Sequence, residues 1–175
     1  MSTQAQAAPL AAPVRSEFQQ LDATIAQTFA REKGILQIVS ASYGTAVSTD
    51  TNTWIGTGLQ AQITRRNPAS SILVWVAQNG VGKSTGNTYC ALRLRRDGTV
   101  LDTFERQAGQ DGLITDNFIG GCGTIYLDAP TAAVNPLTSM TVITYDTQFH
   151  SGANIASAYV QTGPSVSRIV LIEIV

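Results

Sequence analysis

Residues 88–105 read TYCALRLRRDGTVLDTFE, and they carry the clearest structural signal in the chain. Apolar and polar side chains alternate through the first half of this stretch, which is typical of a β-strand with one buried face. Asp97 and Gly98 then supply the two positive-φ positions that a type I′ turn requires. The stretch therefore predicts a β-hairpin whose strands are residues 88–96 and 99–105.

The same strand-like pattern extends over the chain from Ile35 to Val175. Runs rich in β-branched and aromatic residues are separated every eight to twelve residues by Gly, Asn, Asp, Ser or Pro. Besides the hairpin, the predicted strands are residues 35–43, 53–55, 59–65, 71–78, 123–127, 138–146, 155–161 and 168–175. Because no helical pattern separates these short strands, they predict an all-β fold, an antiparallel β-sandwich of the jelly-roll type.

Two of these strands are apolar on both faces. Residues 72–77 read ILVWVA, and residues 169–172 read IVLI before Glu173 interrupts the run. A strand of a sandwich covers the core with one face only. We therefore expect the second face to be buried elsewhere, most simply against another copy of the chain.

Upstream of Gly34 the apolar residues recur at spacings of four and three instead of two. This pattern predicts a short amphipathic, coiled-coil-like helix over residues 14–33 that brings copies of the chain together. Its oligomerisation seam consists of Val14, Phe18, Leu21, Ile25 and Thr28. Residues 1–13 are rich in Ala and Pro and have little to bury, so we expect a flexible anchor segment. The β-sandwich is expected to occupy residues 34–175.

Composition limits the classes of partner. Charged residues make up 13% of the 175 residues and the formal net charge is −1, which gives no reason to expect a nucleic acid as partner. No run approaches the roughly 20 apolar residues of a membrane-spanning helix, so no membrane insertion is expected. The N-terminus lacks the basic and apolar parts of a secretory signal, which predicts synthesis in a cytoplasm.

Residues 77–84 read AQNGVGKS and match the permissive form of a phosphate-binding loop. In a true loop of this kind, the Lys and Ser begin a helix whose amides hold the phosphates. Here an alternating strand follows instead, so we interpret the segment as a Gly-rich loop between antiparallel strands. Lys83→Ala is then expected to change stability by no more than about 0.5 kcal/mol, as at a surface position.

Candidate catalytic and metal-binding residues are few. His150 is the single histidine, and without a Gly-x-Ser-x-Gly motif a surface or loop histidine is favoured over a catalytic one. The acidic pairs, Asp111 with Asp116 and Asp102 with Glu105, lie around turns and lack the spacing of a calcium loop. We therefore expect no enzyme activity, no cofactor and no metal, although three copies of His150 on a threefold axis could recruit a metal ion.

Cysteines and arginines have structural interpretations. Cys90 and Cys122 are too few for a disulfide framework. Cys90 lies in phase with the core-facing residues of its strand, which favours buried free thiols over a bridge and leaves both open. Arg93 and Arg95 share an outward face without interleaved aromatic residues, which favours an intersubunit or solvated face over a basic patch for nucleic acid. Further arginines that such a patch could include are Arg65, Arg66 and Arg96.

Four segments resemble a module of tail-fibre-like and other virion surface proteins of tailed bacteriophages. They are ILQIV at 35–39, TWIGTGLQAQIT at 53–64, PASSILV at 68–74 and LRLRRDGT at 92–99. The resemblance spans residues 35–104 and fades over the C-terminal third. It implies a non-enzymatic virion component, usually a homotrimer, whose partners are other phage proteins of the capsid or tail. Head or tail location, host and receptor are not identified by these segments.

The competing hypothesis is a carbohydrate-binding module that recognises a host surface glycan. In such a module exposed aromatic rings serve as stacking platforms, and the candidates are Trp54, Tyr89, Tyr126 and Tyr159. A third hypothesis is an enzyme that degrades capsule or cell wall. The absence of a clustered acid-base set in the sequence weighs against the enzyme.

Overall fold

The computed structural model describes most of the chain downstream of Lys33. The described residues are 34–67, 69–84, 87–110, 117–129, 142–152 and 156–175. The predicted anchor at 1–13 and the predicted helix at 14–33 lie outside them.

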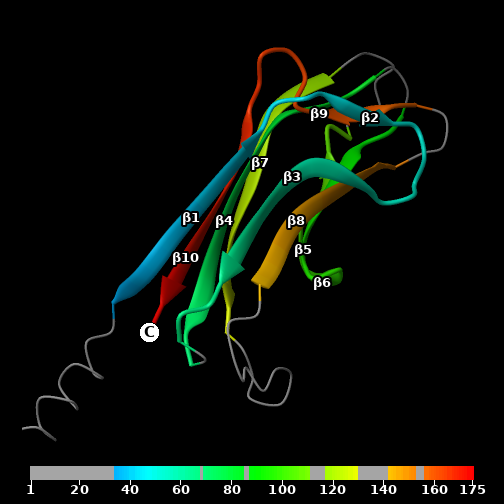
Figure 1. Cartoon of the computed structure of the whole chain (residues 1–175). Coiled ribbons are helices and arrows are strands. Elements are labelled where there is room, and N and C mark those ends of the chain that lie inside the picture. Colours follow the sequence, from blue (N-terminus) through cyan, green and yellow to red (C-terminus); the bar gives the residue numbers. More distant parts are fainter. Residues whose placement is uncertain (1–33, 68, 85–86, 111–116, 130–141, 153–155) are drawn as a thin grey trace, which may run out of the picture. The chain divides into compact units, whose positions relative to one another are not determined.

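Ten β-strands within the described residues form two antiparallel sheets, and Figure 1 shows the two layers. Sheet A contains β1 (Ile35–Tyr43), β2 (Val47–Thr49), β4 (Ser71–Lys83), β7 (Asn117–Asp128), β9 (Ala158–Val160) and β10 (Ser167–Ile174). Sheet B contains β3 (Ile55–Thr64), β5 (Cys90–Arg96), β6 (Thr99–Ala108) and β8 (Val142–Ser151). The predicted antiparallel β-sandwich is thus confirmed.

The long strand β4 organises sheet A. Along one edge it pairs with β7, and along the other it pairs with β10 and then with β9. β1 pairs with β10 and β2 pairs with β9, so the eight long strands lie in the orders β1-β10-β4-β7 and β3-β8-β5-β6. Apart from the β5–β6 hairpin, neighbouring strands in these orders are distant in sequence, so the sheets are held together by long-range pairing.

The core lies between the two sheets and is filled by every second side chain. On β3 the burial alternates from Thr57 onward, and Leu59 and Ile63 are each 1% exposed. They pack in one cluster with Val74 of sheet A and Leu94 of sheet B. The period-two pattern of apolar and polar residues in the sequence arises from this alternation of inward and outward side chains.

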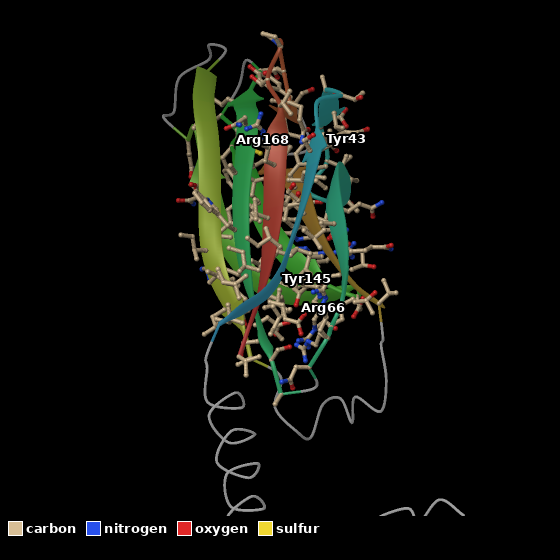
Figure 2. The ribbon with its side chains drawn as sticks, turned by 60° about the vertical axis from the view of Figure 1, so that its left-hand side comes forward. Tyr43, Arg66, Tyr145 and Arg168 are labelled. Atoms are coloured by element: carbon tan, nitrogen blue, oxygen red, sulfur yellow. The ribbon has the colours of Figure 1, made fainter. Side chains whose placement is uncertain are left out.

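Gly58 allows the two sheets to approach each other. Its φ is +86°, and a Cβ at this position would lie 2.2 Å from a ring carbon of Tyr43. The Tyr43 ring on β1 therefore occupies the space over Gly58 on β3, and a larger residue would displace it. Tyr43 is visible near one end of β1 in Figure 2.

The predicted hairpin is confirmed. Asp97 and Gly98 have φ values of 46° and 84°, as the type I′ turn requires, and Arg96 pairs with Thr99. The strands on either side are β5 and β6.

Several predicted strand bounds were wrong. The predicted strand at 53–55 does not exist as such, because β3 begins at Ile55 and passes through a register shift between Gly56 and Gln60. β4 continues past the predicted end at Gln78, since Gly80 adopts a φ of +61° and the register shifts there without ending the pairing. The short strand β2 was missed, and the predicted strand at 155–161 is reduced to β9 within the described residues.

Glu173 is a buried carboxylate that holds the β3–β4 connection against β10. It is 0% exposed and accepts hydrogen bonds from the Arg66 and Asn67 amides (2.8 and 3.0 Å), the Ser70 hydroxyl (2.5 Å) and the Gln37 amide (2.6 Å). Burial by itself raises the pKa of Glu173, but these hydrogen bonds outweigh it and hold the pKa below its ordinary value. Figure 2 shows Arg66 at the end of the sandwich that this carboxylate occupies.

A second buried acid connects the two sheets. Asp128 at the end of β7 accepts hydrogen bonds from Arg96 on β5 at 2.6 and 2.8 Å, and from the Tyr145 hydroxyl on β8 at 2.6 Å. Burial and the hydrogen bond to Asp128 raise the pKa of Tyr145. The phenol therefore stays protonated and keeps donating to the carboxylate over the physiological pH range.

We predict that Glu173→Gln destabilises the fold by about 3 kcal/mol at pH 7, because the amide nitrogen of Gln would face backbone donors. The folded pKa of Glu173 lies below its ordinary value of 4.5, so the wild-type advantage is complete above pH 4.5 and is lost as the pH falls through the lowered pKa. Urea unfolding of both proteins between pH 3 and 7 measures this. Asp50→Asn, at an exposed acid, is the control, and a pH-independent difference for Glu173→Gln would contradict the prediction.

Candidate functional site

The outer face of sheet A is apolar. The inward residues of β4, such as Val74 and Val76, are fully buried, whereas Trp75 between these two residues is 55% exposed. The apolar face consists of Ile38, Leu73, Trp75, Ile125, Leu127, Val170 and Ile172. None of these side chains carries a charge, and the expectation that β4 and β10 are apolar on both faces is confirmed.

Strand register arranges the apolar face in rows that cross the sheet. One row contains Leu127, Leu73, Ile172 and Ile38 from β7, β4, β10 and β1. The next row contains Ile125, Trp75, Val170 and Ser40. Neighbouring side chains in a row belong to adjacent strands, so they form one continuous surface. Contiguous exposed apolar surface of this kind marks an interaction site.

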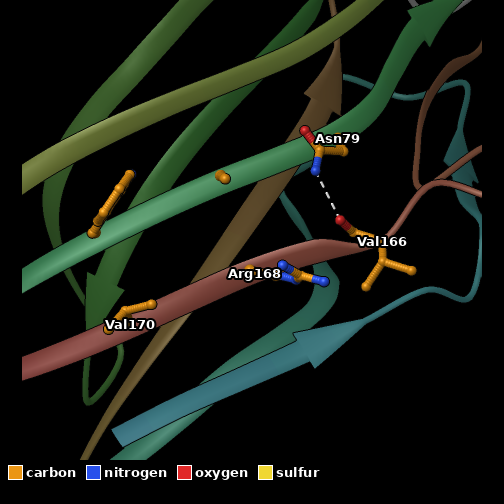
Figure 3. Close-up of a pocket in the computed structure, with 6 residues that line it drawn as sticks. Asn79, Val166, Arg168 and Val170 are labelled. Atoms are coloured by element: carbon orange, nitrogen blue, oxygen red, sulfur yellow. Dashed lines mark hydrogen bonds between the residues drawn. The ribbon is translucent and has the colours of Figure 1, made fainter. Parts of the chain in front are cut away.

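A groove lies beside the apolar face, toward the Ser167 end of β10. It encloses a cavity of about 470 Å³ between Trp75, Val170, Val166 and the exposed Arg168. Figure 3 shows these surroundings, with the Asn79 side-chain amide donating a hydrogen bond to the Val166 carbonyl at 2.8 Å. Arg168 places a positive charge at the border of an otherwise neutral surface.

The outer face of sheet B is polar. Arg95 forms a two-pronged ion pair with Asp146 at 2.8 and 2.9 Å, and Arg93 donates to the Gln148 carbonyl oxygen at 2.9 Å through Nε. Burial and the neighbouring Arg95 lower the pKa of Arg93. The prediction that Arg93 and Arg95 share an outward face is confirmed. The five arginines do not form one patch, because Arg96 pairs with buried Asp128 and Arg65 is 5% exposed.

An aromatic cluster lies at one end of this polar face. The rings of Trp54 and His150 meet edge to face at 4.3 Å, and Tyr89 lies 6.2 Å from His150. The Arg93 guanidinium carbon lies 4.2 Å from the centre of the Trp54 ring, within the range of a cation–π contact. His150 pairs with Ala91 across β8 and β5, so strand register brings these residues together.

The other two predicted aromatic platforms lie elsewhere. Tyr126 packs against the core between the sheets, and the Tyr159 hydroxyl donates a hydrogen bond to the Lys83 carbonyl at 2.7 Å. Neither joins the cluster of Trp54, Tyr89 and His150. The proximity of Trp54 to His150 was not predicted, because it depends on the pairing of β3 with β8.

The structure agrees that residues 77–84 do not form a phosphate-binding loop. Our interpretation of this segment as a Gly-rich loop between strands was wrong, however. Residues 77–83 belong to β4, and Lys83 is its last residue and is 0% exposed. Lys83 and Ser84 therefore lie at the end of a strand, and they do not open a helix that could hold a phosphate. The expectation that Lys83 is a dispensable surface residue is contradicted by its burial.

The described acidic candidates, Asp102 and Glu105, accept hydrogen bonds from within the sandwich. Asp102 accepts from the Thr124 hydroxyl at 2.9 Å, and Glu105 accepts from the backbone amides of Arg106 and Gln107, both at 2.9 Å. Asp111 and Asp116 lie outside the described residues. Within the described ranges, no three His, Cys, Asp or Glu side chains are grouped closely enough to hold a metal ion.

No helix long and apolar enough to span a membrane occurs in the described part of the chain.

Both cysteines are free thiols. Cys90 is fully buried in the core, as its phase in the strand predicted, and Cys122 is half-buried. Burial, with the charge of Glu105, raises the pKa of Cys122 to about 11, and burial raises that of Cys90 as well. Thiols held in the protonated form are poor nucleophiles and poor metal ligands.

The predicted oligomerisation residues lie outside the described part of the chain. They are Val14, Phe18, Leu21, Ile25 and Thr28. Their role therefore stays a prediction. Within the described residues, the apolar face of sheet A is a continuous and partly exposed surface.

Comparisons with known proteins identify no family. No protein-family model and no curated protein match the chain. Among solved structures, the VP2 subviral particle of infectious bursal disease virus matches with 9% identity and a TM-score of 0.25. The match covers 82% of this chain and 41% of the VP2 chain, so this chain spans less than half of that protein's length. At this TM-score nothing about function follows from the likeness.

We predict that Lys83→Ala lowers the free energy of unfolding by about 2 kcal/mol or more, because it removes a fully buried stem and leaves a cavity. Lys83→Met keeps most of the stem, so its loss should be smaller. Chemical denaturation measures both, and Arg168→Ala, at an exposed site, is the control. A change below about 0.5 kcal/mol in Lys83→Ala would indicate a surface position after all.

Proposed function

We propose that this chain is a non-enzymatic structural subunit of a virion and assembles as a homotrimer. The proposal that copies of the chain assemble is supported by the neutral, continuous apolar face of sheet A. The finer assignment is a fibre or a head or tail decoration component of a tailed bacteriophage, anchored to the particle by the N-terminal region.

The two outer faces of the sandwich support assembly through sheet A. Sheet B exposes charged and amide groups that are paired along the sheet, such as Arg95 with Asp146, and these are well hydrated. Sheet A exposes Trp75, Ile125 and Leu127, which gain free energy when removed from water. One face is thus suited to solvent and the other to a protein surface.

The favoured occupant of the apolar face is another copy of the same chain. In a trimer the side chains nearest the threefold axis come from identical positions of the three copies, and charged residues of one sign would repel there. The apolar face carries no charge, so copies meet without this penalty. The heptad seam predicted upstream of Gly34 requires copies as well, and three strands of coiled coil accommodate it.

The virion context rests on the resemblance of residues 35–104 to phage surface proteins. Sandwiches of the jelly-roll type also occur in viral capsids and lectins, which is an analogy at the level of fold. The partners in this proposal are other virion proteins of the capsid or tail. The alternative, a carbohydrate-binding module, concerns the opposite sheet, where Trp54 and His150 are in contact.

We predict that wild-type protein has a mass three times 18.5 kDa in light scattering, and that Ile125→Lys lowers this mass. Ile125 is 66% exposed in the subunit, so the fold tolerates the lysine, but three new charges would be buried in the assembly. The melting temperature of the separated subunit should stay close to that of the control.

Gln62→Lys is the matched control, because it places the same charge on an exposed strand position of sheet B. It should leave the mass unchanged. A wild-type monomer at micromolar concentration would refute the trimer, and an intact trimer of Ile125→Lys would refute docking through sheet A.

We also predict that deletion of Met1 to Lys33 leaves the sandwich folded and prevents its incorporation into particles. Residues 35–175 form a separate compact unit with its own core, so folding does not need the deleted segment. Particle incorporation and circular dichroism measure the two parts. Phe18→Asp in the full chain is the comparison, since it weakens the predicted seam and keeps the anchor. Normal incorporation of the deletion variant would show that the sandwich itself docks.

A further inference from the structure

A cavity on the outer face of sheet B adjoins the contact between Trp54 and His150. Its volume is about 460 Å³, within the range of roughly 300–1,000 Å³ typical of small-molecule sites. Ala91 lies beside His150 on the neighbouring strand, and its short side chain leaves the space open. We call this cavity the Trp54 pocket, and its other lining side chains are Tyr89, Thr103, Arg106, Gln107 and His150.

The aromatic wall of the Trp54 pocket is fixed in place. Arg93 lies over the Trp54 ring and is held by two hydrogen bonds to the Gln148 carbonyl oxygen, at 2.9 and 2.5 Å. Tyr89 rests on Gly152, where a Cβ would come within 2.2 Å of the tyrosine ring. Rigid aromatic surfaces bind apolar ligand faces at little cost in conformational entropy.

His150 offers a defined hydrogen-bonding group. Its Nδ1 lies 2.7 Å from the Ser151 carbonyl oxygen, which can only accept, so Nδ1 carries the proton. In the neutral ring Nε2 then has a lone pair. This nitrogen can accept a hydrogen bond from a ligand hydroxyl. The fixed tautomer therefore favours ligands that place a hydrogen-bond donor next to Nε2.

The opposite wall carries polar groups that are free to bind. Within the described residues, the side chains of Thr103, Arg106 and Gln107 make no hydrogen bond or ion pair. Thr103 and Gln107 can both donate and accept, and Arg106 carries a permanent positive charge on an exposed side chain. A guanidinium of this kind binds a carboxylate through two parallel hydrogen bonds.

We propose that the Trp54 pocket binds an acidic carbohydrate, an oligosaccharide that carries a carboxylate. The C–H faces of a sugar ring pack on Trp54 and Tyr89, and its hydroxyls donate to Nε2 of His150. Its carboxylate pairs with Arg106. A neutral sugar lacks the charge-assisted pair with the exposed Arg106, and an apolar ligand makes no hydrogen bond to the polar wall, so both are expected to bind less tightly.

This site does not depend on the proposed assembly. The Trp54 pocket lies on the outer face of sheet B, and the apolar face lies on the opposite side of the sandwich. Packing of copies through sheet A therefore leaves the pocket accessible. Each copy would contribute one site, and several sites on one particle would bind a glycan-coated surface with avidity.

Titration calorimetry of the full-length protein tests the proposal. The probes are 3′-sialyllactose, trigalacturonic acid and lactose, the last being the neutral counterpart of the first. We expect at least one acidic probe to bind about tenfold more tightly than lactose, which corresponds to 1.4 kcal/mol. Arg106→Gln should remove this preference, whereas Arg168→Gln, which removes an exposed charge from sheet A, should keep it.

Absence of binding by both acidic probes at millimolar concentration would overturn the proposal. Equal affinity of wild type and Arg106→Gln, or binding of lactose as tight as that of sialyllactose, would overturn the role of the carboxylate. Light scattering on the same samples separates this inference from the assembly. A trimer without glycan binding refutes the pocket alone, and a monomer that binds glycan refutes the assembly alone.

Discussion

Strands β4 and β10, at the centre of sheet A, are apolar on both faces, and this constraint governs the rest of the structure. The inward faces, with Ile72, Val74 and Leu171, require a second sheet to cover them, and sheet B supplies it. The outward faces, with Trp75 and Val170, have no cover within the described residues. Because the hydrophobic effect acts equally on both faces, a single sandwich satisfies only half of this requirement.

Two buried carboxylates fix the geometry that apolar packing leaves free. Apolar contacts are non-directional, so they do not by themselves define where one strand end meets a neighbouring turn. Glu173 collects hydrogen bonds from the turn between β3 and β4, and Asp128 connects β7 to Arg96 and Tyr145 on the other sheet. Such groups are costly to bury unless every partner is present. They therefore favour one arrangement of the sheets over others.

The sandwich separates two kinds of surface. Copies of the chain are proposed to meet on the apolar face of sheet A, whose own residues are uncharged. Sheet B carries the ion pair of Arg95 with Asp146 and the aromatic cluster around His150. A binding site on the polar sheet stays accessible when the apolar sheet is covered, so assembly and recognition do not compete for one face. Both roles use the alternation of side chains along a strand.

The sequence by itself determined the all-β class of the sandwich, the Asp97-Gly98 hairpin, the core position of Cys90 and the presence of two strands without a polar face. These features are local, because the period of two and the turn residues act within a few positions. Only the tertiary structure decided that Lys83 is buried at the end of a bulged strand, that Glu173 caps a turn, and that Trp54 meets His150. Each of these depends on which strands pair and in which register, and pairing joins residues far apart in the chain.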